Sequence, residues 1–265
     1  MRKPYALITG STSGIGLEIA HNLGKRGFNL ILTARRKVLL KTISIKISKK
    51  YNVKVDYICG DLSLKETPNK IFEYCDLKKY DINILINNAG YGIVAPLHES
   101  DMEDEEKCIR VLSISVIALT KSFLNKMMKK GDGKIMIVSS VAAFAPPSAV
   151  QSLYGPTKTF VNRFSELINL NYNKYGIYST AVCPGYTITN FHTASGVQDE
   201  MNRVPKFLKS SAFRVASESV DAMFKRKHLY VPTKRWKIIA FLLKTVPRPI
   251  FKILSSIIAP GRFEK

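Results

Sequence analysis

The chain has 265 residues, enough for one large hydrophobic core, and with 46% hydrophobic residues it is too apolar for an intrinsically disordered protein. Its formal net charge is +21, and residues 203–265 alone contain 15 basic and 3 acidic residues. Such an excess either favours association with anionic partners or reflects a lysine-rich genome, and it excludes no class of fold.

The cysteines and histidines indicate neither a disulfide framework nor a metal site. The four histidines are dispersed without metal-ligand spacing, so we predict no metal. The N-terminus carries no cleavable apolar segment, and we see no long uncharged apolar run, so we expect a cytoplasmic protein that is neither secreted nor membrane-spanning. Reduced, buried thiols are expected at all four cysteines, namely Cys59, Cys75, Cys108 and Cys183.

Short apolar runs alternate with segments of helical spacing along the chain. We expect strands at 5–9, 29–33, 53–59, 82–86, 134–138, 178–183 and 229–231. We expect helices at 15–25, 38–50, 65–77, 103–129 and 157–174. Because the strands are almost continuously apolar and alternate with helices, the pattern predicts an α/β fold: one doubly wound domain over 1–233, with a parallel sheet of about seven strands and helices on both faces.

A glycine-rich turn separates the first strand from the first helix. Gly10 permits a tight turn, Gly14 lets the backbone approach a pyrophosphate, and Gly16 allows close packing of helix on strand. Three glycines alone are weak evidence, but a strand, turn and helix in this order predict a dinucleotide site at the positive helix N-terminus. The predicted cofactor contacts here are Gly10, Ser11, Ser13, Gly14, Ile15 and Gly16.

The end of the second strand bears on which dinucleotide binds. The run Thr33-Ala34-Arg35-Arg36 has no carboxylate to accept the ribose 2′-hydroxyl of NAD. Two guanidinium groups at Arg35 and Arg36 can instead hold the 2′-phosphate of NADP. The alternative is that both arginines are the solvated start of a helix. We expect NADP(H), with NAD(H) less favoured.

Tyr154 and Lys158 are four residues apart, one helical turn on the same face. A tyrosine is a poor acid at neutral pH because its reference pKa is about 10. A nearby lysine stabilises the phenolate and lowers that pKa. Beside a dinucleotide, the pair would deliver a proton where a hydride arrives, which is the chemistry of a carbonyl reductase. Without Lys158 and the glycine turn, Tyr154 would be interpreted as an ordinary aromatic residue on a helix.

Over nearly its whole length the chain resembles the short-chain dehydrogenase/reductase (SDR) family, which has a Rossmann-type fold. The resemblance depends on five motifs in the same order and on the expected elements. They are the glycine-rich turn, Asn87-Asn88-Ala89-Gly90 after the fourth strand, Ser139-Ser140 after the fifth, Tyr154-x-x-x-Lys158, and Pro184-Gly185 after the sixth.

The resemblance implies a role for each matching residue. Ser140 would hold the substrate carbonyl, Tyr154 would donate the proton, and Lys158 would also hold the nicotinamide ribose; these three are the predicted catalytic residues. Asp61 would contact the adenine, and Ser139 would be structural. The remaining predicted cofactor contacts are Asp61, Leu62, Asn88, Ala89, Gly90, Pro184, Gly185, Thr187 and Thr189.

The sequence departs from the family pattern in two places. Leu112 stands where the family usually has a catalytic asparagine that holds a water of the proton relay, and Ser113 or Ser115 are candidates to replace it. Ser140 lies 14 residues before Tyr154, one more than expected, which indicates an enlarged loop around Pro146. The first departure bears on rate more than on the type of reaction.

The segment after the sixth strand is expected to form a substrate lid over about 187–213. Its apolar residues suit a hydrophobic carbonyl or alcohol substrate, although they would equally suit plain packing. They are Phe191, Val197, Met201, Val204, Phe207 and Leu208.

Residues 234–265 form a basic, apolar extension, which we expect to be helical. Its two apolar runs are too short to span a bilayer, which needs about 20 residues. Two interpretations stay open. The extension packs on the sheet edge or on a second subunit, or it lies on an anionic membrane surface, such as the inner face of the cell membrane.

Together these features predict an NADPH-dependent oxidoreductase that reduces a hydrophobic ketone or aldehyde to the alcohol, acting as a homo-oligomer. One alternative is a 3-oxoacyl-thioester reductase of fatty-acid metabolism. Another is a non-catalytic dinucleotide-binding protein of the same fold, which Leu112 favours and Ser140, Tyr154 and Lys158 oppose. We expect no nucleic-acid binding, because no basic helix-turn-helix or aromatic RNA-binding signature is present.

Overall fold

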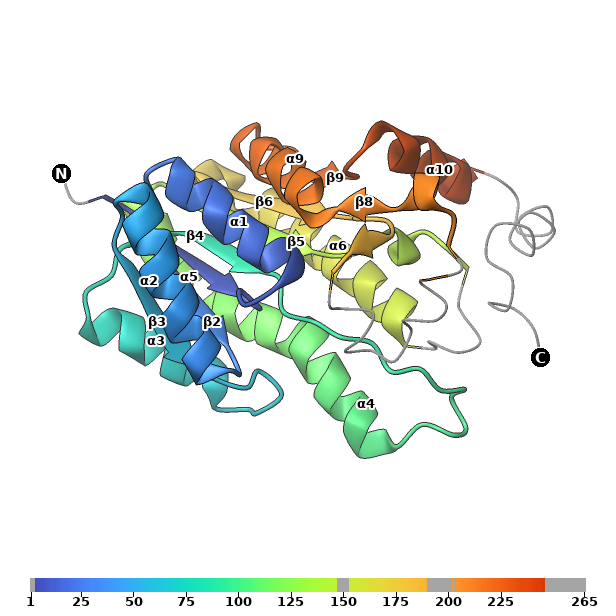
Figure 1. Ribbon diagram of the computed structural model, residues 1–265, viewed down its shortest axis with the longest axis horizontal. Coiled ribbons are helices and arrows are strands. Elements are labelled where there is room, and N and C mark those ends of the chain that lie inside the picture. Colours follow the sequence, from blue (N-terminus) through green and yellow to red (C-terminus); the bar gives the residue numbers. More distant parts are fainter. Residues whose placement is uncertain (1–2, 147–152, 190–201, 203, 246–265) are drawn as a thin grey trace.

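The computed structural model describes residues 3–146, 153–189, 202 and 204–245. Seven parallel strands form one sheet in the order β3-β2-β1-β4-β5-β6-β9 (Figure 1). The predicted doubly wound α/β fold is therefore confirmed. The strands are β1 (Tyr5–Thr9), β2 (Asn29–Ala34), β3 (Val55–Cys59), β4 (Ile82–Asn87), β5 (Gly133–Val138), β6 (Ile177–Val182) and β9 (Leu229–Tyr230).

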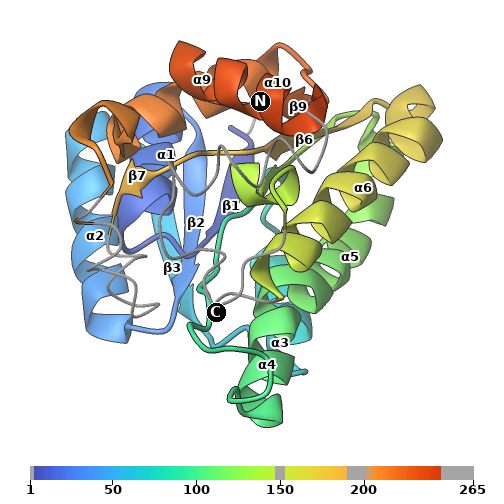
Figure 2. The ribbon, with the colours of Figure 1, turned by 90° about the vertical axis from the view of Figure 1, so that its right-hand side faces the viewer.

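Helices cover both faces of the sheet (Figure 2). One face packs against α1 (Gly14–Lys25), α2 (Lys37–Tyr51) and α9 (Ala212–Phe224). The other packs against α3 (Thr67–Leu77), α5 (Ser115–Lys130) and α6 (Tyr154–Tyr172). Each face has its own hydrophobic cluster, because side chains of successive strand residues point to opposite sides. This explains why the strands are apolar along their whole length.

Helix α9 occupies a region to which the sequence analysis assigned no element. The Ser211 side chain caps it by accepting a hydrogen bond from the Arg214 N–H at 3.3 Å. Ala216, Val220 and Met223 are buried against the sheet and α1. The buried residues of α9 recur at helical spacing, so the local pattern also indicates this helix, and packing on α1 stabilises it.

A continuous helix runs from Met102 to Lys130, as α4 (Met102–Ile109), a π-helical turn (Arg110–Ile114) and α5. It is long and apolar enough to cross a membrane by length and composition, a feature that our sequence analysis did not anticipate. Over half of its most apolar window is nevertheless buried inside the protein, where Leu119 and Phe123 belong to the core. The helix is accounted for as a core helix of the α/β fold.

Strand order reverses between β1 and β4, and the chain leaves these two neighbouring strands toward opposite faces of the sheet. In open α/β sheets, ligands bind beyond the carboxyl ends of the strands at such a switch point. Thr9, the last residue of β1, joins the two strand ends: its hydroxyl donates to Ile86 O and accepts from the N–H groups of Asn88 and Ala89 at 2.9 and 3.0 Å. The glycine-rich turn and the Asn88–Gly90 segment therefore meet here.

The C-terminal part of the described chain folds back onto the same end of the sheet. A two-stranded sheet pairs β7 (Thr187–Ile188) with β8 (Ser210–Ser211). Helix α10 (Lys234–Thr245) follows β9 and buries Trp236, whose indole N–H donates to Leu208 O at 2.9 Å. One face of this helix therefore packs against the domain, whereas Ile238, Phe241 and Leu242 stay exposed, so both interpretations of the extension stay open. Residues 246–265 lie outside the described residues.

All four cysteines are free thiols, as expected, but one expectation about them was wrong. Cys75, Cys108 and Cys183 are buried, whereas Cys59 is exposed at the end of β3. The reason is that β3 is the edge strand of the sheet and Cys59 is its last residue, beyond the cover of the helices.

We expect Trp236→Ala to lower the free energy of unfolding by about 3–5 kcal/mol, because it removes a buried indole and leaves a cavity. Phe241→Ala on the same helix is the matched control, since Phe241 is 64% exposed, and its effect should stay within about 0.5 kcal/mol. Denaturant unfolding of both variants checks this. Equal losses would show that α10 is not anchored through Trp236.

Candidate active site

The glycine-rich turn between β1 and α1 requires glycine for identifiable reasons. Gly10 and Gly14 have φ of +64° and +55°, which L-residues with a side chain rarely adopt. A Cβ on Gly16 would lie 2.4 Å from Gly10 O and 2.3 Å from the Asn88 amide nitrogen, closer than any side chain could approach. The turn thus presents bare backbone and the first N–H groups of α1, which have no partner within the helix.

The three polar residues of the turn, Ser11, Thr12 and Ser13, have different environments. Ser11 is fully buried, and its hydroxyl donates to Thr33 O at 3.2 Å, so its side chain ties the turn to β2. Ser13 is the N-cap residue of α1. Thr12 accepts a hydrogen bond at 3.3 Å from the guanidinium of Arg36, which therefore reaches back from the end of β2 to the turn.

The end of β2 carries no carboxylate, but one lies nearby in the loop that follows β3. An Arg35 guanidinium nitrogen is 4.0 Å from an Asp61 oxygen, and both side chains are substantially exposed. Asp61 also accepts from the Ser63 N–H at 2.9 Å. Leu62, predicted to contact the cofactor, has its side chain in the core, 7% exposed, so only its backbone can serve that role.

Asn88 braces the site as well as lining it. Its amide NH₂ donates to Thr9 O at 2.9 Å and to Gly10 O at 3.1 Å, so the side chain holds the glycine-rich turn against β4. Further along, a Cβ on Gly90 would lie 2.8 Å from the Leu112 side chain and 3.9 Å from Lys158 Nζ. The Asn88–Gly90 segment therefore lines the space between the glycine-rich turn and Lys158.

Leu112 occupies the position where the resemblance led us to look for an asparagine. It is buried, lies in the π-helical turn, and contacts the Gly90 backbone. Of its two proposed replacements, Ser115 donates its hydroxyl to Val111 O at 2.8 Å and is thus engaged with its own helix. Ser113 is buried in the same π-helical turn. Beside Lys158, the position where an asparagine was expected therefore carries the apolar side chain of Leu112.

Ser140 begins a short 3-10 turn (Val141–Ala143) immediately after β5. Its hydroxyl accepts from the Ala142 N–H at 3.1 Å, which orients the side chain at the turn's start. Its neighbour Ser139 is buried and donates to Lys158 O at 3.0 Å. Ser139 thus has the structural position that the resemblance implied, linking β5 to α6.

Helix α6 begins at Tyr154 and carries both other predicted catalytic residues. Thr159 donates to Ala143 O at 3.0 Å, which holds the first turns of α6 beside the 3-10 turn after Ser140. Lys158 Nζ lies 5.5 Å from the centre of the Tyr154 ring. Ser140, which follows β5, and the Tyr154–Lys158 pair at the start of α6 therefore lie at the same end of the sheet, beyond the carboxyl end of β5.

Lys158 is 5% exposed, and its ammonium donates to Val138 O at 2.8 Å. Burial lowers the pKa of this lysine from 10.5 to about 8, because the charged form loses its hydration. At neutral pH the group is still mostly protonated. A positive charge next to the Tyr154 ring favours the phenolate form of that tyrosine.

The segment after β6 closes the site on the side of α1. A Cβ on Gly14 would lie 2.9 Å from Thr189, so Thr189 sits directly over the start of α1. Thr187 donates to Gly185 O at 2.9 Å. A Cβ on Gly185 would lie 1.9 Å from the Trp236 ring, so α10 is pressed against the Pro184-Gly185 motif.

Sequence reasoning passed over three groups that organise this site. They are the Thr9 hydroxyl, the Val138 carbonyl and the Trp236 indole. The one available signal was that Trp236 is the only tryptophan of the chain. Nearly half of the lid, 190–201 and 203, lies outside the described residues, including Phe191, Val197 and Met201. Within the lid's described part, Leu208 is buried and Phe207 is 62% exposed.

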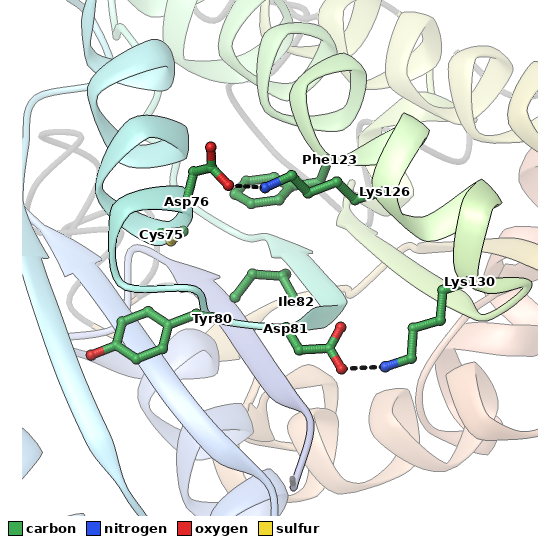
Figure 3. Close-up of a pocket in the computed structure, with 8 residues that line it drawn as sticks. All are labelled: Cys75, Asp76, Tyr80, Asp81, Ile82, Phe123, Lys126 and Lys130. Carbon is green, nitrogen blue, oxygen red and sulfur yellow. Dashed lines mark hydrogen bonds and ion pairs between the residues drawn. The ribbon is translucent and has the colours of Figure 1, made fainter.

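A small pocket elsewhere is distinct from this site (Figure 3). It lies between α3 and α5 at the amino end of β4, the opposite end of the strand from Asn88. Two ion pairs, Lys126 with Asp76 and Lys130 with Asp81, border it (Figure 3). Exposed ion pairs of this kind are worth about 0–1 kcal/mol, and nothing there suggests chemistry.

The switch point fits a dinucleotide. Bare backbone at the glycine-rich turn and the positive N-terminus of α1 suit a pyrophosphate. Arg36 beside that turn suits the additional negative charge of a phosphate. Lys158, near Gly90 at the other end of the Asn88–Gly90 segment, would be a hydrogen-bond donor to a nicotinamide ribose. The individual contacts stay predictions.

The family model described as short chain dehydrogenase matches residues 4–200. The chain belongs to this family. Its seven-stranded parallel sheet agrees with the fold of solved short-chain dehydrogenase structures.

Two curated relatives illustrate the range of similar SDR proteins. The very-long-chain 3-oxoacyl-CoA reductase of Rattus norvegicus is 31% identical over 189 residues, 70% of this chain and 60% of the relative. Hydroxysteroid dehydrogenase-like protein 1 of Gallus gallus is 32% identical over 222 residues, 83% of this chain and 65% of the relative. The chain thus spans less than two thirds of the length of these relatives.

Two solved structures resemble this SDR chain over nearly its whole length. The short-chain dehydrogenase from Sphingobium yanoikuyae in complex with NADPH is 27% identical with a TM-score of 0.81, covering 92% of this chain and 96% of that one. The bulky-bulky ketone specific alcohol dehydrogenase from Comamonas testosteroni is 25% identical with a TM-score of 0.77, covering 94% and 96%.

We expect kcat/KM for carbonyl reduction to fall as pH rises through about 8. The reason is that Lys158, with its pKa lowered to about 8, carries its charge below that pH and loses it above. A neutral lysine no longer stabilises the Tyr154 phenolate. The pH profile of kcat/KM reports groups of the free enzyme and is the measurement. A profile that stays flat up to pH 10 would contradict this role.

Proposed function

We propose that the protein uses NADPH to reduce a ketone or aldehyde carried on a hydrophobic substrate, giving the alcohol. One observation carries the proposal: Ser140, Tyr154 and Lys158 converge beside a switch point whose glycine-rich turn suits a dinucleotide. NADPH, when bound, supplies the hydride. Nothing in this assignment requires a metal.

Each residue of the proposed site has a separate task. The Ser140 hydroxyl, held by the Ala142 N–H, donates to the substrate carbonyl and orients it. Tyr154 gives its phenolic proton to the carbonyl oxygen as the alcohol forms. Lys158, anchored on Val138 O, stabilises the resulting phenolate until it is reprotonated. Proton donation by a positioned group contributes about 10²–10⁴-fold in rate.

The preference for NADPH over NADH is supported by charge. Arg36 contacts the glycine-rich turn through Thr12, and Arg35 is exposed beside it. Together they offer two cations where a 2′-phosphate would lie next to the turn. Asp61 is the one acid close to this position, and its ion pair with Arg35 offsets its charge.

Within this activity, a 3-oxoacyl thioester is the specific substrate class that the relatives favour. Several curated relatives at 31–32% identity are named very-long-chain 3-oxoacyl-CoA reductases. Such a substrate is itself a ketone on a long apolar chain. Our sequence-based ranking placed this class second, because the chain continues well past its last strand. The helix α10 that follows that strand packs against the site and is compatible with either class.

The test is NADPH oxidation against a panel of carbonyl compounds. The panel should contain 3-oxoacyl thioesters of increasing chain length, bulky ketones, oxosteroids and simple aldehydes, with Tyr154→Phe as the blank. The proposal expects turnover that rises with the apolar size of the substrate. If no compound is reduced faster than by Tyr154→Phe, the non-catalytic alternative becomes the better description.

We also propose that the protein is a cytoplasmic homo-oligomer. The outer face of α6 exposes Phe160, Leu167 and Leu170, at 46%, 48% and 81%, which recur at helical spacing. An apolar stripe of this kind is typical of a subunit contact. Four free cysteines agree with a reducing compartment. Analytical ultracentrifugation decides the oligomeric state.

A further inference from the structure

Helix α10 has two apolar faces, and the protein covers only one of them. On the inner face, Trp236 and Ala240 are buried against the region around Cys183. On the outer face, Ile238, Phe241 and Leu242 are 63%, 64% and 47% exposed. Their i, i+3, i+4 spacing places all three on one side of the helix, away from the domain.

Basic side chains border this outer face on both flanks. Arg235 donates to Phe207 O along one flank. On the other, Lys237 donates to the Tyr230 hydroxyl at 3.3 Å, and Lys244 Nζ lies 4.1 Å from the centre of the Phe144 ring. All three cations stay exposed at the seam between helix and domain. The helix contains no acidic residue at all.

We propose that the outer face of α10 docks on an anionic lipid surface. Ile238, Phe241 and Leu242 would enter the boundary between headgroups and acyl chains, while the flanking cations would contact lipid phosphates. An apolar centre with basic flanks is the pattern of a helix lying in the plane of a membrane interface. Each basic residue near an anionic leaflet adds to the attraction.

Charge argues for lipid over a second copy of the chain as the occupant. Residues 203–265 contain 15 basic and 3 acidic residues, so two copies meeting through α10 would bring two strongly positive regions together. An anionic surface neutralises the same region. The residues after α10, at 246–265, continue the mixture of apolar and basic side chains.

Docking through α10 would bring the candidate active site close to the membrane. Its inner face touches Gly185, and Lys244 covers Phe144, four residues after Ser140. The mouth of the site would therefore lie next to the bilayer, where an apolar carbonyl compound concentrates. Figure 2 shows α10 at one end of the molecule, beside α9 and β9. This consequence rests on the proposed function, whereas the docking itself does not.

Flotation of the full-length protein with vesicles tests the docking. Vesicles of phosphatidylcholine with phosphatidylglycerol are compared with pure phosphatidylcholine, at low and high salt. The key variant is Ile238→Ser/Phe241→Ser/Leu242→Ser. Its matched control is Val38→Ser/Ile45→Ser, which removes exposed apolar residues from α2, another lysine-rich helix (82% and 57% exposed). Turnover of a short, water-soluble ketone shows whether each variant keeps a working site.

We expect wild type and the α2 control to float with anionic vesicles at low salt, and much less at high salt or without anionic lipid. The α10 variant should lose at least about tenfold in partitioning, with soluble-substrate turnover unchanged. The proposal is overturned if wild type stays at the bottom, or if the α10 variant floats equally well, which would place the contact elsewhere, including 246–265. It is also overturned if wild type is an oligomer that the α10 variant disperses, because the face would then be a contact between copies. None of these outcomes depends on turnover, so an inactive enzyme would refute the proposed function alone.

Discussion

Tyr154→Phe should reduce carbonyl turnover by about 10²–10⁴-fold, because it removes the proton donor and leaves the rest of the site in place. The affinity for NADPH should be almost unchanged, since the ring and the cation of Lys158 beside it remain. Steady-state rates with the best compound of the carbonyl panel, together with a direct NADPH titration, measure the two effects separately. A lower rate with unchanged NADPH affinity would indicate loss of the proton donor, whereas loss of both would indicate a damaged fold.

Tyr175→Phe is the matched control, because it deletes a phenolic hydroxyl from an exposed tyrosine just beyond the end of α6. It should keep the wild-type rate. Lys158→Ala should also abolish turnover, and it should weaken NADPH as well if the lysine holds the ribose. Wild-type activity in Tyr154→Phe would remove this tyrosine from the mechanism and with it the proposed reaction.

Replacing Arg35 and Arg36 together with alanine should raise the KM for NADPH by about 10–100-fold, with little effect on NADH. The reason is that only NADPH carries the 2′-phosphate, and a hydrogen bond to a charged group is worth about 1.5–3 kcal/mol. The ratio of kcat/KM values for the two cofactors is the quantity to measure. Asp61, no longer paired with Arg35, should then favour NADH further.

Lys37→Ala is the control for this change, since Lys37 is the next cation along the chain, exposed at the first position of α2. It lowers the net charge without touching the glycine-rich turn, and should leave the cofactor ratio near that of wild type. If Lys37→Ala matched the double variant, general electrostatic attraction would explain the preference. If neither changed the ratio, the phosphate would be held by other residues, or the enzyme would use NAD.

Much of the fold follows from local pattern. Apolar runs bounded by helical segments locate the sheet strands, because buried parallel strands need apolar residues on both faces. The turn after β1 was predictable because glycine adopts the positive φ found at Gly10 and Gly14 far more readily than other residues. The Tyr154–Lys158 pair was predictable because one helical turn separates the two residues. Local rules decided these features, so the sequence shows them directly.

Other features depend on contacts between distant segments. The packing of α9 on α1 is one of them, although the helical spacing of the apolar residues of α9 is present in the sequence and was overlooked. The engagement of Asn88 with the glycine-rich turn, and of Lys158 with Val138 O, involves residues 20 to 79 positions apart. The exposure of Cys59 follows from its place on the edge strand. Sequence periodicity does not indicate which distant residues come into contact.

By itself, the sequence determined the α/β class, the order of the seven sheet strands along the chain and the chemical identity of the predicted site residues, because these follow from residue type and short-range spacing. Only the tertiary structure decided that Leu112 forms an apolar wall beside Lys158, and that burial lowers the pKa of that lysine to about 8. The tertiary structure also decided which face of α10 is covered. Trp236 turns inward onto Gly185 while Phe241 turns to solvent, and both are large aromatic residues in the same basic helix. Hydrophobicity alone ranks such residues equally, and the partner surface that the fold brings to the helix decides between them.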